Sequence, residues 1–213
     1  MNQSESLFKE YLNEQRINFS NDFLVNSKNN KNVDFRLSKR QQIILCDVKE
    51  IKDSKVKLRP GDMKLGGNIN AQDHIRGDIK KLRQKFDTPP TDPLLLVSMN
   101  FASNFFTALT VSRALMGEIG VIFERGSEGN ISALHHLQKG NASLRQKMNT
   151  SISGVLLFDI AIGNHYLFRS TYAKHEIPSD FFSGIKILDL CKTETQEDII
   201  ELSKIMFWNK DEI

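Results

Sequence analysis

The stretch Ile43-Ile44-Leu45-Cys46-Asp47-Val48-Lys49-Glu50 decides the fold, because an apolar run ends there abruptly in charged residues. Side chains alternate between the two faces of a strand, which places Asp47 and Lys49 on one face and Val48 on the other. The row that ends in Asp47 and Lys49 starts with the apolar residues Ile43 and Leu45. The pattern therefore predicts a strand that carries a carboxylate and an amine side by side at the end of its inward row.

A second apolar strand precedes this one, Val33-Asp34-Phe35-Arg36-Leu37. Because the polar residues 38–41 can form a tight connection, the two strands are predicted to be neighbours, with Asp34 close to the charged strand end. Two carboxylates and a lysine that converge are the smallest set that can build a hydrolytic site around a hard metal ion. Charged strand ends are common, so the alternative is an ordinary pair of solvated charges.

Further helices and strands are predicted on both sides of this pair. Residues 4–16 have apolar side chains at helical spacing, and Ser4 or Ser6 can cap that helix. Residues 72–86 predict a second amphipathic helix with a basic flank, and residues 94–99 an apolar strand after a proline-rich break. The sequence thus predicts an α/β fold with a mixed central β-sheet flanked by helices.

The order of these elements, together with Asp34 and the acid-x-lysine pair Asp47 and Lys49, resembles the PD-(D/E)XK nuclease superfamily. The resemblance covers about residues 1–99 and implies a restriction-endonuclease-like core of the order α-β-β-β-α-β. It implies that Asp34, Asp47 and Lys49 are catalytic, although Val33 stands where proline is usual. The helix sequence Glu5-Ser6-Leu7-Phe8-Lys9-Glu10-Tyr11-Leu12 is similar to the first helix of that superfamily and nominates Glu5 as a further catalytic residue.

Two of these assignments have alternatives in the sequence. Glu50 and Lys52 repeat the acid-x-lysine spacing, but they fall on the other face of the strand, and only a β-bulge would reverse that preference. Glu5 lies in the first turn of its predicted helix, where acids are common because they favour the helix dipole. A capping role explains Glu5 as well as catalysis does.

The chemistry that these residues predict is Mg²⁺-dependent hydrolysis of phosphodiester bonds, in which Mn²⁺ can replace Mg²⁺. Mg²⁺ takes one or two carboxylates, so Asp34 and Asp47 suffice as side-chain ligands, with the carbonyl of Val48 completing the set. Lys49 would orient the attacking water and offset developing negative charge. Crowded acids cost stability without metal, so this hypothesis predicts that alanine at Asp47 leaves the metal-free protein at least as stable. A structural ion pair predicts a loss.

Nucleic acid is the predicted partner, and the resemblance favours DNA over RNA. The residues predicted to contact its backbone are Lys52, Lys55, Lys57, Arg59 and Lys64, in a turn-rich segment, and Arg76 and Lys80 on the second helix. Solvated surface charge is the alternative for that segment. The alternative functions are a catalytically inactive nucleic-acid-binding module on the same fold and a protein-interaction module.

Composition bounds the remaining possibilities. The chain has 213 residues, of which 39% are hydrophobic and 26% charged, with a net charge of +3. These values predict one domain over 1–213. The resemblance implies that a nuclease-like core at about 1–125 is followed by a C-terminal α+β elaboration at about 126–213. Two cysteines favour the cytoplasm, and the absence of a long apolar run excludes a membrane partner. A homodimer is an alternative to a monomer, although no heptad repeat identifies an interface.

Within the predicted elaboration, residues 131–149 are expected to be irregular or partly helical. Residues 152–160 and 165–169 are expected to form a β-hairpin, and residues 196–208 a closing amphipathic helix.

Overall fold

The computed structural model describes residues 2–24, 31–52, 71–101, 108–125, 131–139, 143–144, 149–160 and 163–190. Its helices and strands are α1 (Gln3–Glu14), β1 (Asn18–Leu24), β2 (Asn32–Lys39), β3 (Gln42–Ile51), α2 (Ala71–Arg83), β4 (Leu94–Asn100), α3 (Ala108–Met116), β5 (Glu118–Arg125), β6 (Ile131–Lys139), β7 (Ile152–Asp159), β8 (Asn164–Ser170) and β9 (Lys186–Leu190).

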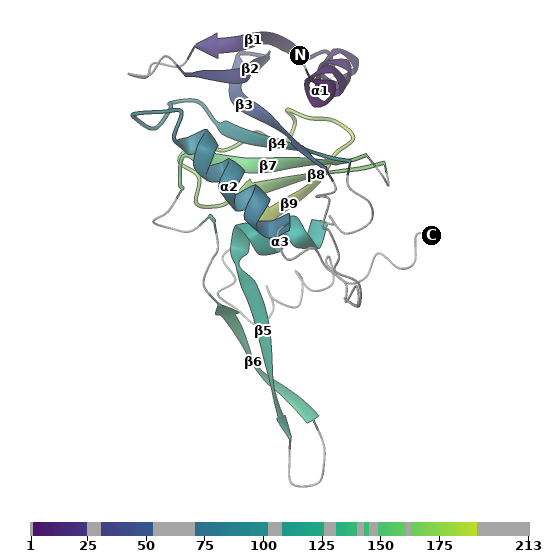
Figure 1. Cartoon of the computed structure of the whole chain (residues 1–213), viewed down its shortest axis with the longest axis vertical. Coiled ribbons are helices and arrows are strands. Elements are labelled where there is room, and N and C mark those ends of the chain that lie inside the picture. Colours follow the sequence, from purple (N-terminus) through teal and green to yellow (C-terminus); the bar gives the residue numbers. More distant parts are fainter. Residues whose placement is uncertain are drawn as a thin grey trace, which may run out of the picture.

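Seven of the strands form one mixed sheet in the order β1-β2-β3-β4-β7-β8-β9 (Figure 1). The pairs β1–β2, β2–β3 and β7–β8 are antiparallel. The pairs β3–β4, β4–β7 and β8–β9 are parallel. The predicted α/β class with a mixed central sheet is therefore confirmed.

Apolar side chains cover both faces of this sheet. On one face, residues of α2 and α3 such as Ile75, Ile79 and Leu115 pack against the strands. On the other face, Phe8 and Leu12 of α1 are joined by Phe181 from the segment after β8. Strands buried on both faces read as continuous apolar runs, as Leu94-Leu95-Leu96-Val97 does in β4. The central strands thus form a fixed frame between the two layers.

The strand β3 alternates between these two layers as its sequence predicts. Leu45 belongs to the layer that contains α2, whereas Cys46 and Val48 belong to the layer that contains α1. The connection to β2 is a turn at Arg40 and Gln41, whose φ angles of 49° and 69° fit the twist of a tight hairpin. The antiparallel pairing of the two strands is confirmed, and it brings their charged residues to one end of the hairpin.

Several local predictions are wrong. The cap of α1 is Asn2, not Ser4 or Ser6, because Asn2 and Glu5 form a reciprocal capping box and Ser4 is buried. Residues 131–139 form the strand β6 rather than an irregular segment, because β5 offers a partner strand along its whole length.

The predicted hairpin of β7 and β8 is confirmed. The predicted closing helix at 196–208 lies outside the described residues.

Figure 1 shows the two-stranded ribbon of β5 and β6 extending away from the seven-stranded sheet. None of the helices in the described part of the chain is long and apolar enough to cross a membrane.

A glycine on β7 gives a test of this packing. A Cβ atom at Gly154 would overlap the carbonyl oxygen of Phe168 on β8 and lie 3.2 Å from Cδ1 of Ile177, whereas one at Gly77 on α2 would meet nothing within 4 Å. We expect Gly154→Ala to lower the free energy of unfolding by about 1–3 kcal/mol through overpacking. We expect Gly77→Ala to raise it by up to about 1 kcal/mol through helix propensity. Urea denaturation measures both, and equal shifts would contradict this packing.

Candidate functional site

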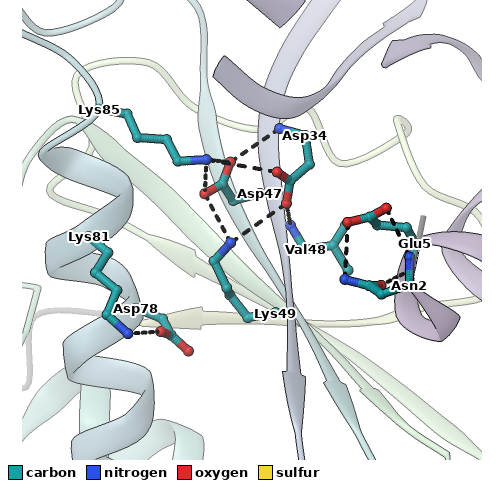
Figure 2. A network of polar contacts seen from close by, with 9 residues as sticks. All are labelled: Asn2, Glu5, Asp34, Asp47, Val48, Lys49, Asp78, Lys81 and Lys85. Carbon is teal, nitrogen blue, oxygen red and sulfur yellow. Dashed lines mark hydrogen bonds and ion pairs between the residues drawn. The ribbon is translucent and has the colours of Figure 1, made fainter. Parts of the chain in front are cut away.

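Four charged side chains meet where β2 and β3 separate (Figure 2). Asp34 comes from β2, Asp47 and Lys49 come from β3, and Lys85 comes from the turn that follows α2. The Nζ atom of Lys49 lies 3.6 Å from Oδ2 of Asp34 and 3.3 Å from Oδ2 of Asp47. The three residues that the sequence nominated from two separate strands are therefore in contact.

The end of the β2–β3 ladder explains how the carboxylates are held. The last residue pair of the ladder is Phe35 with Cys46, one position short of the two aspartates. Beyond it, the backbone N–H of Asp34 donates to Oδ1 of Asp47 at 3.2 Å, and the N–H of Val48 donates to Oδ2 of Asp34 at 2.8 Å. Each carboxylate thus accepts a backbone hydrogen bond from the neighbouring strand, which orients both acids without freezing a long side chain.

Lys85 is the member of this cluster that the sequence did not reveal. Its Nζ atom lies 2.8 Å from Oδ1 and 2.7 Å from Oδ2 of Asp47, and 3.8 Å from Oδ1 of Asp34. Lys85 follows the buried Leu82 by three residues, so it lies beside the apolar stripe of α2, toward the sheet. That spacing is the one signal in the sequence that could have identified it.

The cluster is mostly removed from solvent. The side chain of Asp47 is fully buried, and those of Asp34, Lys49 and Lys85 are 24%, 27% and 21% exposed. Burial is the main cause that raises the pKa of Asp34, and the charge of Asp47 adds to it; the N–H of Val48 and the two lysines act in the opposite direction. For Lys49, burial acts to lower the pKa, but the carboxylates of Asp47 and Asp34 outweigh it and raise the pKa above its ordinary value.

One oxygen of the cluster lacks a hydrogen bond. Oδ2 of Asp47 is buried and is approached by both amines, at 2.7 Å and 3.3 Å, but neither contact has the geometry of a hydrogen bond. Both contacts are ion pairs, so this oxygen already faces two ammonium groups. A carboxylate oxygen that only cations approach is a suitable ligand for a metal ion.

The donor set fits Mg²⁺ with few protein ligands. Within the described ranges, no group of three or more His, Cys, Asp or Glu side chains could hold a metal ion. Mg²⁺ does not need one, since it commonly binds through one or two carboxylates and keeps several waters. Asp34 and Asp47 are the two carboxylates of the cluster that could hold such an ion. The structure records Val48 only as an amide donor to Asp34, so its carbonyl ligand stays a prediction.

Glu5 helps to cap the start of α1. Its carboxylate accepts from the backbone N–H of Asn2 at 3.3 Å and from the Asn2 side chain at 3.0 Å, while its own N–H donates to Asn2. Glu5 also faces a cavity of about 310 Å³ that it shares with Asp34 and Asp22. Figure 2 shows Glu5 on the far side of β3 from the two lysines. Its catalytic role stays a prediction.

The basic residues predicted to bind nucleic acid are only partly described. Lys52 forms an ion pair with Glu50 at 2.9 Å, so the second acid-x-lysine pair is separate from the cluster. Arg76 donates to Asp73, Gln72 and the carbonyl of Arg113, which ties α2 to α3. Lys80 is exposed on α2. Lys55, Lys57, Arg59 and Lys64 lie outside the described residues.

Comparison with known proteins finds no family model, no curated protein and no solved structure that matches this chain.

Proposed function

We propose that this chain is a Mg²⁺-dependent nuclease that hydrolyses phosphodiester bonds in nucleic acid, with DNA as the favoured substrate. The observation that carries the proposal is the contact of Lys49 with both Asp34 and Asp47, from two neighbouring strands, at a buried strand end. Buried ionisable groups that shift each other's pKa are more common at functional sites than elsewhere.

The arrangement of the first elements supports the same proposal. The order α1, β1, β2, β3, α2, β4 agrees with the order α-β-β-β-α-β that the resemblance implies. The first three strands pair antiparallel and β4 joins β3 in parallel, so the acid-x-lysine strand lies inside the sheet. In the PD-(D/E)XK resemblance, this is the strand that carries the catalytic pair.

The residues of the cluster divide the chemistry between them. A Mg²⁺ ion held by Asp34 and Asp47, with the carbonyl of Val48, would supply Lewis-acid stabilisation of the phosphate and a more acidic water. The backbone hydrogen bonds to the two carboxylates fix their positions before substrate arrives. The ammonium of Lys49, held between the two acids, orients the attacking water and offsets negative charge that develops on the phosphate.

A second candidate is a catalytically inactive module, either nucleic-acid-binding or protein-binding, on the same fold. The observation that favours it is charge balance: two lysines already pair with two aspartates, so the cluster is neutral without metal. A neutral, buried network of this kind can also have a purely structural role.

Cleavage of supercoiled plasmid separates these candidates. We expect the wild-type chain to nick plasmid in Mg²⁺ and not in EDTA, and we expect Asp47→Asn to abolish nicking because it removes the negative charge needed to hold the cation. Binding of DNA without nicking would favour the inactive nucleic-acid-binding module. Neither binding nor nicking at physiological salt would favour the protein-interaction module.

A further inference from the structure

The ammonium of Lys85 lies across the same carboxylate edge that a metal ion would use. It is 2.7 Å and 2.8 Å from the two oxygens of Asp47 and faces Asp34 as well. Resting on the proposed function, we propose that Lys85 is a built-in competitor of the divalent cation. Its ammonium holds the carboxylates in the metal-free protein and leaves them when the metal binds.

The surroundings of Asp47 make displacement necessary. A carboxylate offers about four lone-pair directions. Oδ1 of Asp47 accepts from Lys85 and from the N–H of Asp34, and Oδ2 is approached by Lys85 and Lys49. A Mg²⁺ ion needs oxygen at about 2.0–2.1 Å, which brings it into the space beside an ammonium that is itself within 3 Å. Two cations cannot share that edge, so one donor has to move.

Lys85 is the donor that can move at the lowest cost. The N–H of Asp34 is backbone, and Lys49 is carried by β3, where its backbone pairs with Ser98 of β4. Lys85 reaches the cluster on a flexible stem from a turn outside α2, not from a strand of the sheet. The turn itself is anchored, because the N–H of Lys85 donates to the carbonyl of Leu82 and Lys31 donates to the carbonyl of Gln84. The amine can therefore swing into solvent while the backbone stays in place.

The consequence is a lowered affinity for metal. If only a fraction of the protein molecules is in the state that can bind, the apparent affinity is the intrinsic affinity multiplied by that fraction. If the amine is off the carboxylates about one-tenth of the time, Lys85→Met would tighten Mn²⁺ binding about tenfold. The matched control is Lys81→Met. Lys81 lies on α2, its side chain is 71% exposed, and it pairs with Asp78 instead of the cluster.

The rate at which Lys85 is acylated in the wild-type chain measures the displacement directly. We expect Lys85 to react slowly with an amine acylating reagent in EDTA and severalfold faster in saturating Mg²⁺, with Lys81 unchanged. Mass spectrometry of the digested protein measures both lysines in one sample. This experiment needs no variant, so it stands even if Lys85→Met fails to fold.

The outcomes separate this inference from the proposed function. If the wild-type chain binds Mn²⁺ but the reactivity of Lys85 is unchanged or lower with metal, the competitor role is wrong and the metal site stands. If Lys85→Met does not tighten Mn²⁺ binding beyond Lys81→Met, the competitor role is also wrong. If neither the wild-type chain nor Lys85→Met binds Mn²⁺, the metal site of the proposed function fails, and this inference fails with it.

Discussion

Replacing Lys49 with methionine is expected to lower Mg²⁺-dependent cleavage by about a hundredfold or more, the usual effect of removing one group that stabilises transition-state charge. The amine of Lys49 lies within 3.6 Å of both carboxylates, so in the proposed site it lies beside the metal ligands. Methionine keeps the apolar length of the side chain and removes its charge. The initial rate of plasmid nicking at saturating Mg²⁺ is the measurement.

The matched control is Lys186→Met. Lys186 is an exposed lysine at the start of β9, the edge strand of the sheet that lies four places from β3. Lys186→Met removes one positive charge, as Lys49→Met does. A general effect of charge on nucleic-acid binding would therefore lower the cleavage rates of both variants equally. Cleavage by Lys49→Met at the wild-type rate would remove Lys49 from the reaction.

Replacing Asp47 with alanine is expected to lower the free energy of unfolding by about 3–5 kcal/mol in EDTA, since it removes one partner from a buried ion pair. Asp47 is fully buried, contacts Lys49 and Lys85, and accepts the N–H of Asp34. Removing it leaves two amines with a single carboxylate between them and one backbone donor without its acceptor. Urea denaturation in EDTA measures the loss.

Asp189→Ala is the control for this prediction. Asp189 forms a two-point contact with Arg169, at 2.6 Å and 2.7 Å, but its side chain is 46% exposed. Exposed ion pairs contribute about 0–1 kcal/mol. A loss at Asp47 no larger than the loss at Asp189 would mean that the buried cluster contributes little to stability.

This expectation reverses the one that the sequence gives for a metal site. Two acids without partners would repel each other, and alanine at Asp47 would then leave the metal-free protein at least as stable. In the structure, the lysines offset that repulsion, and Lys85 is the residue that completes the balance. The sign of the effect therefore depends on a contact between residues 38 positions apart in the chain.

Local patterns were enough to predict the centre of the fold. The alternation in β3 and the short polar connection to β2 depend on neighbouring residues, and both Asp34 and Asp47 follow from them. Strand β1 was not identified, because its side chains are mostly exposed and its three apolar residues, Phe19, Phe23 and Leu24, form neither a continuous run nor a regular alternation. Strand β6 was missed because β5, not its own pattern, supplies its hydrogen bonds.

The site shows the same division between local and long-range information. Asp47 and Lys49 share a face because of strand geometry, which a sequence reveals directly. The place of Lys85 depends on tertiary packing, whereas the capping box of Asn2 and Glu5 is a local pattern of two residues three positions apart. Ser4 lies inside the first turn of α1 and is buried, so it does not cap that helix.

In the proposed site, Asp34 and Asp47 hold one divalent cation next to Lys49. Anomalous diffraction from a crystal of the wild-type chain soaked in Mn²⁺ shows directly whether such a cation is bound. We expect one manganese peak in contact with oxygens of both aspartates, with the amine of Lys85 displaced from Asp47. The contradicting result is a crystal at saturating Mn²⁺ with no peak at this position, in which Lys85 and Lys49 still pair with both carboxylates.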